Sequence, residues 1–232
     1  MCINADDIRH VCTWNQDLSF NQNNDEFLKY ESTYPALLEA GKRCRENPDI
    51  INIKILALAV YGWMPCILGR HGNMGYETSE DNSDNNINSI DESIGKSVKK
   101  FCQSGEELND FEKLKFFIDK SWVGLSKFLH FLRPDRYAIW DSNVSRALLF
   151  AHQATQQNPN IDINGVGEII NRGFRSRPDH ANNNYNNFLN YERTVQGLLR
   201  LNEYNEVAQE QGDYPSRYIE KRLFCFGQRL KR

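Results

Sequence analysis

The chain has 232 residues, and its 40% hydrophobic and 12% aromatic content is enough to bury a core and excludes a wholly disordered protein. No run reaches the roughly 20 apolar residues of a membrane span, and residues 1–7 lack the regions of a secretion signal, so we expect a cytoplasmic protein. The net charge of -3 divides into -8 over residues 1–95 and +5 over residues 96–232. The second part therefore favours phosphate contact, although an ordinary solvated surface explains the asymmetry equally well.

The first half of the chain predicts two helices followed by a loop. Residues 24–44 have apolar side chains at helical spacing, with a break expected at Pro35. Pro48-Asp49 is a helix-start signal, and residues 50–61 are apolar nearly all round, which predicts a central helix that ends at Gly62-Trp63. Residues 72–95 are rich in Asn, Ser, Asp and Gly, so we expect a long disordered or flexible insertion there.

The second half predicts further helices. Apolar spacing favours helices over residues 106–120 and 122–132, the second stopped by Pro134. After an extended stretch at 137–140, Asp141 or Ser142 is expected to cap a third helix. Helices are also expected at 166–171, 185–201 and 216–230, and no strand pattern is visible. The sequence thus predicts a mainly α, two-lobed helical architecture forming a single domain over residues 1–232.

Lys127 and Asp141 are the candidate reactive residues. On a helical wheel Trp122, Leu125 and Phe128 share one face, whereas Lys127 projects to the other, where Gly124 leaves room beside the amine. Asp141 would lie at the start of the next helix, where backbone N–H groups attract an anion. We therefore expect the two groups to converge on a pocket. The alternatives are a solvated lysine and an ordinary helix cap.

The run Ser126-Lys127-Phe128-Leu129-His130-Phe131-Leu132-Arg133-Pro134, followed by Ile139-Trp140-Asp141, resembles the catalytic core of the helix-hairpin-helix DNA glycosylases. It is most similar to the 8-oxoguanine glycosylase-like (OGG-like) branch, in which a pattern SKxLxFLxPxxxxIxD recurs. The chain has only Gly124 of the family's Gly-hydrophobic-Gly turn, and Lys127 and Asp141 are 14 residues apart, about one helical turn closer than usual.

The resemblance implies a DNA glycosylase, with a lyase step as well if the chain follows the members of the family that have lyase activity. It assigns Asp141 to cleavage of the N-glycosidic bond, where a carboxylate stabilises positive charge on the sugar. It assigns Lys127 to attack on C1′, which forms a Schiff base. The partner would be duplex DNA with the target nucleotide flipped out of the helix. Base repair and defence against phages with modified DNA both suit such an enzyme.

Other residues are weaker candidates. Gly124 and Ser126 precede Lys127 and are expected to approach DNA. Trp63 and Trp140 could stack on an extruded base, although aromatic residues beside apolar runs are more often core. His130 and His152 have no partner at metal or nucleophile spacing. A basic loop is suited to phosphates, although solvation explains it equally; it contains Arg172, Arg175 and Arg177.

The cysteines favour reduced, mostly buried thiols. The chain has six of them, spread without CxxC pairs or metal-ligand spacing. We therefore expect no metal, no iron–sulfur cluster and no other cofactor. The competing hypothesis is a non-catalytic nucleic-acid-binding or accessory module of a defence or toxin system, which has kept the glycosylase fold and lost the chemistry.

Overall fold

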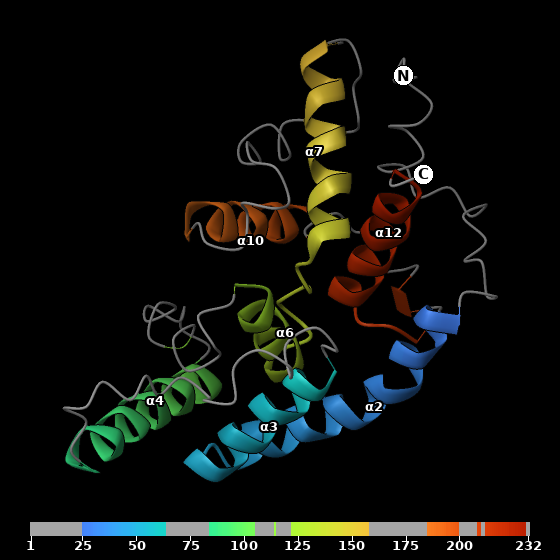
Figure 1. Ribbon diagram of the computed structural model, residues 1–232. Coiled ribbons are helices and arrows are strands. Elements are labelled where there is room, and N and C mark those ends of the chain that lie inside the picture. Colours follow the sequence, from blue (N-terminus) through green and yellow to red (C-terminus); the bar gives the residue numbers. More distant parts are fainter. Residues whose placement is uncertain are drawn as a thin grey trace. The chain divides into compact units, whose positions relative to one another are not determined.

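The computed structural model (Figure 1) describes residues 25–63, 84–104, 114, 122–157, 185–199, 208–209 and 212–230. All regular elements in these ranges are α-helices, which confirms the mainly α prediction. None of the described helices has the length and apolar character that crossing a membrane requires. The contacts divide the chain into two compact units, with a boundary between Arg133 and Pro134. We call Asn24–Arg133 the N-terminal unit and the part from Pro134 onward the C-terminal unit.

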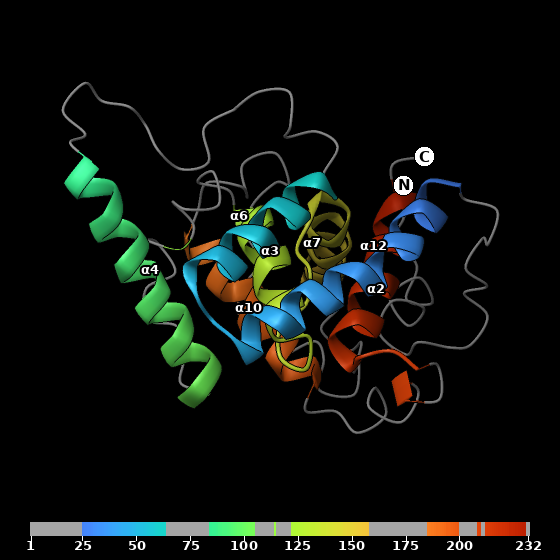
Figure 2. The same ribbon diagram turned by 90° about the horizontal axis from the view of Figure 1, so that it is seen from below.

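Four helices are described in the N-terminal unit. Their bounds are α2 Asp25–Glu46, α3 Ile50–Gly62, α4 Asp84–Ser104 and α6 Trp122–Leu132. The helices α2 and α3 lie against each other, and α6 packs on both (Figure 2). The turn between α2 and α3 is built by Asp49, whose side chain accepts the backbone N–H of Asn52 at 2.8 Å. This confirms the predicted helix start at Pro48-Asp49.

Helix α2 runs without a break through Pro35, so the expected interruption there was wrong. Pro35 is exposed, whereas Tyr34 and Leu37 on either side of it are buried. The buried positions continue along the same face to Gly41 and Cys44. Burial of this face on both sides of the proline offsets the roughly 3 kcal/mol that an interior proline costs.

Helix α3 is not central. Its buried face carries Ile53, Leu56 and Val60, but Ile51, Ile55 and Leu58 are 66%, 51% and 52% exposed. The uniformly apolar sequence gave no indication of which face would be covered, because periodicity locates a buried side only where polar residues mark the other. The prediction of a helix buried all round was therefore wrong.

Helix α4 begins at Asp84, so residues 84–95 are helical and not part of a loop. Apolar residues recur at positions 87, 90, 94, 98 and 101, and three of them, Ile94, Val98 and Phe101, are buried. This three-and-four spacing is the signature of an amphipathic helix. It was concealed by the Asn, Ser and Asp residues between the apolar positions. The remainder of the predicted insertion lies outside the described residues.

Helix α6 has the predicted bounds, and its end is held by α2. The guanidinium of Arg45 donates from Nη1 to the carbonyl oxygens of Phe131 at 3.1 Å and Leu132 at 2.7 Å. The last carbonyls of a helix have no partner within the helix, so this contact satisfies two of them. Tyr34 on α2 also forms a buried hydrogen bond of 2.7 Å with Nε2 of His130. His130 is therefore structural. Residues 106–120 lie outside the described ranges except Leu114, which is helical and buried.

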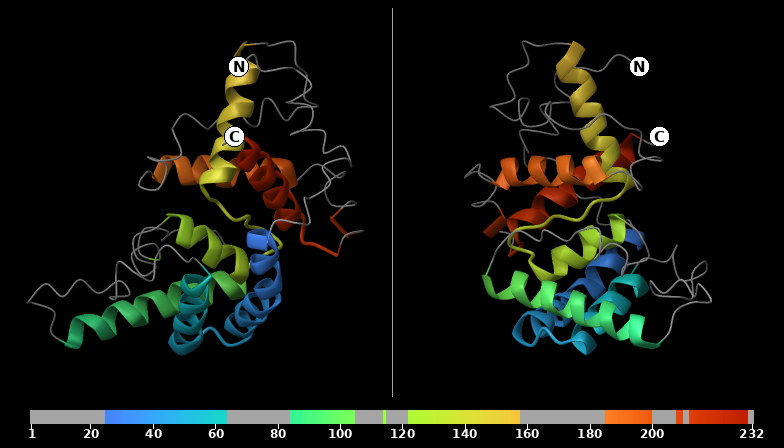
Figure 3. Two further views of the ribbon diagram at one scale, coloured as in Figure 1. Left: turned by 45° about the vertical axis from the view of Figure 1, so that its right-hand side comes forward. Right: turned by 90° about the vertical axis from the view of Figure 1, so that its left-hand side faces the viewer.

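The C-terminal unit contains three named helices, α7 Ser142–Gln157, α10 Tyr185–Leu199 and α12 Pro215–Arg229. Helix α12 packs along α7 and also contacts α10 (Figure 3). A Cβ atom on Gly227 would lie 1.9 Å from the carbonyl oxygen of Asn143, so α7 and α12 approach with backbone against backbone. The predicted helices at 185–201 and 216–230 are confirmed with small shifts of their ends, and residues 166–171 lie outside the described ranges.

Candidate functional site

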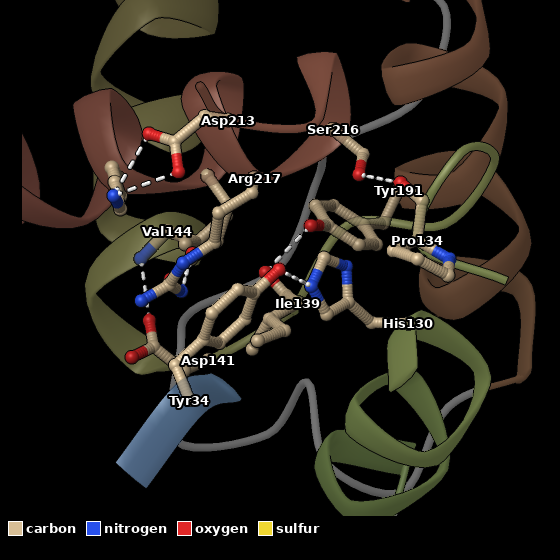
Figure 4. Close-up of polar contacts among 12 residues, drawn as sticks. Tyr34, His130, Pro134, Ile139, Asp141, Val144, Tyr191, Asp213, Ser216 and Arg217 are labelled. Atoms are coloured by element: carbon tan, nitrogen blue, oxygen red, sulfur yellow. Dashed lines mark hydrogen bonds and ion pairs between the residues drawn. The ribbon is translucent and has the colours of Figure 1, made fainter. Parts of the chain in front are cut away.

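Asp141 is the N-cap of α7. Its Oδ1 accepts the backbone N–H of Val144 at 2.8 Å (Figure 4). It also accepts the N–H of Asn143 at 2.8 Å, and the carbonyl oxygen of Asp141 accepts the N–H of Ser145 at 2.9 Å. The side chain is half-buried. The cap fixes the direction of the carboxylate and places it at the positive end of the helix dipole. The predicted cap at Asp141 is therefore confirmed as a structural feature.

The stretch before Asp141 is a buried non-helical link. Residues 137–140 are all buried and carry no regular structure. The hydroxyl of Tyr191 on α10 donates to the carbonyl oxygen of Ile139 at 2.7 Å, and Nε2 of Gln196 donates to that of Arg136. The hydroxyl of Ser216 on α12 donates to the carbonyl oxygen of Pro134. Three side chains thus hold the backbone between Pro134 and Ile139, which fixes the approach to Asp141.

Trp140 belongs to the core of the C-terminal unit. Its ring is fully buried and stacks on Tyr191, with 5.7 Å between ring centroids, and its Nε1–H donates to Oγ of Ser145 at 2.6 Å. Trp140 is therefore a core residue, as one of the two interpretations of the sequence proposed. Stacking on an extruded base would require this ring to leave its packed position.

A group of charged side chains is buried close to the link. Arg217 and Glu220 on α12 form an ion pair, and Nη2 of Arg222 donates to the hydroxyl of Tyr218 at 2.9 Å. Glu192 on α10 is buried, and neither of its carboxyl oxygens has a hydrogen-bond partner among the described residues. Burial raises the pKa of Glu192 well above its usual value, and the positive charge of Arg136 opposes this only in part.

Tyr191 lies within the field of three acids. Burial raises the pKa of its phenol well above 10.0, and the negative charges of Glu192, Glu220 and Asp141 raise it further. Burial and the neighbouring acids therefore both disfavour ionisation of Tyr191. The protonated hydroxyl can donate its hydrogen bond to the carbonyl oxygen of Ile139. The carboxyl groups of Asp141, Glu192 and Glu220 thus all act on Tyr191.

Lys127 lies in the N-terminal unit, on the less buried side of α6. Its Nζ is 5.0 Å from the centroid of the Trp63 ring, and this ring meets Phe131 edge to face at 5.3 Å. Lys127 and Trp63 are half-buried, whereas the neighbours Ser126 and Phe128 are fully buried. Gly124 and Phe131, one turn before and after Lys127, are buried, and the contact with Trp63 brings two sequence-predicted site residues together in a cation–π interaction.

Two predicted DNA-binding residues are buried in α6. Gly124 lies inside the packing, and Ser126 is fully buried, with its hydroxyl donating to the carbonyl oxygen of Val123 at 2.8 Å. Contact of these two residues with phosphates would therefore require a rearrangement. The third group of predicted DNA-binding residues lies outside the described ranges: Arg172, Arg175 and Arg177.

Metal and thiol chemistry is not indicated in the part of the chain that the structure describes. No three His, Cys, Asp or Glu side chains of these ranges are grouped as metal ligands. Cys44, Cys102 and Cys225 form no disulfide bond. Burial raises the pKa of Cys44 to about 12 and that of Cys102 to about 11, so both stay protonated at neutral pH.

Sequence reasoning missed the polar interior of the C-terminal unit. Glu192 and Arg217 stand in segments of ordinary amphipathic pattern, where a charged residue is normally taken as exposed. The only signal was an excess of charge: residues 217–222 read Arg-Tyr-Ile-Glu-Lys-Arg and leave few positions for the buried face of a helix.

Comparison of the chain with protein-family models, with curated proteins and with solved structures found no match.

Proposed function

We propose that this protein is a DNA glycosylase that removes a damaged or modified base, with Asp141 supporting base release and Lys127 supporting a lyase step. The observation that carries the proposal is the structure around Asp141. A half-buried carboxylate is held by two N–H groups, and it follows directly on a buried link from the helix that carries Lys127. The order of Lys-bearing helix, link and capping Asp supports the resemblance stated above.

Base release needs a carboxylate in a fixed position. Cleavage of the bond between C1′ and the base nitrogen leaves positive charge on the sugar and an electron pair on the departing base. A carboxylate whose direction is set by the N-terminus of α7 does not have to reorient as this charge develops. The target nucleotide has to be flipped out of the duplex to reach it.

The lyase step would use Nζ of Lys127. After base release, the neutral amine would add to the C1′ aldehyde of the ring-opened abasic sugar, and loss of water would give the Schiff base. The face of Trp63 instead attracts the ammonium ion. We therefore propose that Lys127 leaves the Trp63 ring when it reacts, and that the indole face then stacks on the extruded base.

Borohydride trapping on a panel of duplexes with modified bases tests this proposal. We expect abasic sites on at least one duplex and a covalent protein–DNA product after reduction. Lys127→Arg should abolish trapping, because a guanidinium keeps the charge but forms no Schiff base. Asp141→Asn should reduce base release by about a hundredfold or more, because asparagine caps a helix as well as aspartate but carries no charge.

The matched control is Lys42→Arg, which changes an exposed lysine on α2 that pairs only with Glu46 among the ion pairs described. Trapping and base release should match those of the unmodified protein. Unchanged base release in Asp141→Asn, or unchanged trapping in Lys127→Arg, would overturn the proposal. Duplex binding without any base release would favour the non-catalytic module.

A further inference from the structure

An exposed apolar stripe runs along α3. Ile51, Ile55 and Leu58 are each at least half exposed, and they are spaced four and three residues apart, so they share one face of the helix. The other exposed large hydrophobic side chain in the described ranges is Tyr214, in the other unit. Because the three side chains are adjacent, they form a contiguous apolar patch, and larger patches of this kind are found at binding sites.

A groove opens beside this stripe, between the start of α3 and α4. Its volume is about 420 Å³. Apolar and charged groups both line it: Pro48, Asp49, Ile50, Glu92, Gly95, Lys96 and Lys99. Lys54 is four residues from Ile50 and four from Leu58, so it lies on the row of the helix surface that joins the groove to the stripe.

The far side of the groove is basic. Lys96, Lys99 and Lys100 are exposed on α4. Glu92 pairs with Lys96 at 2.6 Å, but both side chains are mostly exposed, so the pair is easily exchanged for another. An apolar stripe on α3 is thus followed across a groove by a positively charged helix face.

We propose that this surface binds an acidic amphipathic helix of a partner protein. The apolar residues of the partner, spaced three and four apart, would lie on Ile51, Ile55 and Leu58, as in other helix-in-groove complexes. Its Asp and Glu residues would face Lys96, Lys99 and Lys100. We call the six residues the α3–α4 surface. The inference is independent of the proposed glycosylase activity.

Charge complementarity favours this occupant over a second copy of the chain. In a two-fold dimer the same patch meets itself, and the lysines of one copy would approach those of the other. Duplex DNA would use the lysines but leave the stripe exposed, and a lipid surface would leave the groove unfilled.

Selection from a displayed library of random helical peptides tests the inference with the full chain as bait. We expect peptides that carry apolar residues at i, i+3 or i+4, and i+7, with Asp and Glu enriched on one flank. The variant Ile51→Ser/Ile55→Ser/Leu58→Ser should weaken binding of a selected peptide about tenfold or more. It should still fold, because these side chains are largely exposed, and circular dichroism checks this.

A second variant tests the contribution of the lysines of the α3–α4 surface. Lys96→Glu/Lys99→Glu should weaken binding of the same peptide about tenfold at low salt, and by less as salt rises. The control Lys42→Glu/Tyr214→Ser alters an exposed lysine and an exposed aromatic residue outside the surface, and binding should stay within roughly twofold.

Four results would overturn the inference. The first is a selection that yields no peptide dependent on the apolar stripe, and the second is one without acidic enrichment. The third is self-association that the triple serine variant abolishes in sedimentation, because a second copy would then cover the stripe. The fourth is binding of anionic vesicles or duplex DNA through the same six residues with no peptide bound.

Discussion

The carbonyl oxygen of Phe131 lies 1.9 Å from the position that a Cβ atom on Gly41 would occupy. Only glycine therefore allows α2 and α6 to approach this closely. The contact holds the end of α6 against α2, and Lys127 lies one helical turn before Phe131. The absence of a side chain at Gly41 of α2 thus helps to set the position of Lys127 on α6.

Gly41→Ala should destabilise the protein. The new methyl group would overlap a backbone atom, which no side-chain rotation relieves, so we expect a loss of about 3 kcal/mol in the free energy of unfolding. The matched control is Gly95→Ala in α4, where nothing lies within 4 Å and alanine should stabilise the helix by about 0.5–1 kcal/mol. Urea unfolding measures both. Equal stability of the two variants would contradict the close approach.

Arg45→Gln should destabilise the end of α6. It removes a charged donor that satisfies the carbonyl oxygens of Phe131 and Leu132, and we expect a loss of about 1.5–3 kcal/mol. Arg43→Gln is the control, because Arg43 makes an exposed ion pair with Glu39 and should contribute at most about 0.5 kcal/mol. Thermal unfolding followed by circular dichroism compares them, and equal losses would show that Arg45 does not hold α6.

Comparison of Asp141→Ala with Asp141→Asn distinguishes the helix-capping role of Asp141 from the role of its negative charge. Alanine removes the acceptor of two N–H groups and should cost about 1 kcal/mol of stability, whereas asparagine should cost only a few tenths. Chemical denaturation of the two variants measures the difference. If Asp141→Asn is as unstable as Asp141→Ala, loss of base release in that variant would no longer report on the charge.

The raised pKa of Glu192 predicts that the free energy of unfolding depends on pH. Burial raises the pKa of its carboxyl well above the ordinary 4.5, so above that pH the folded state holds a proton that the unfolded state has lost. The contribution of Glu192 to stability is therefore complete below about pH 4.5 and decreases as pH rises.

Glu192→Gln should remove this decrease, because glutamine is nearly isosteric and does not ionise. We expect the variant to gain stability relative to the unmodified protein as pH rises from about 4.5 to about 8. Urea unfolding across this range measures the gain, and other titrating groups cancel in the difference. Parallel stability curves for the two proteins would mean that Glu192 is not protonated in the folded state.

The sequence predicted the helices that combine apolar spacing with a clear start or stop. Helix α6 has the predicted bounds because Pro134 prevents its continuation, and α7 begins where Asp141 supplies a cap. These signals are local, since each depends on residues within one turn of the boundary. The orientation of Lys127 followed from the same local reasoning, because one face of α6 is fully apolar.

The errors of prediction concern features that depend on distant residues. Pro35 stays within α2 because the helix is packed on both sides of it, and the exposed face of α3 is set by which helices lie against the other face. The polar interior around Glu192 arises only when α10 and α12 meet. The pattern of a single helix does not show which other helix it will contact. For the same reason the sequence left open whether Trp140 is a site residue or a core residue, because its burial depends on contact with Tyr191 of α10.

The contact between Lys127 and Trp63 also gives the protein an internal optical probe. An ammonium ion over an indole ring alters its emission, and conversion of the amine to an imine or its withdrawal toward a ligand would change that emission. The chain has four tryptophans, whose emission bands overlap, so the Trp63 signal is obtained as the difference between the unmodified protein and Trp63→Phe. Occupancy at Lys127 can thus be followed in real time without any attached dye.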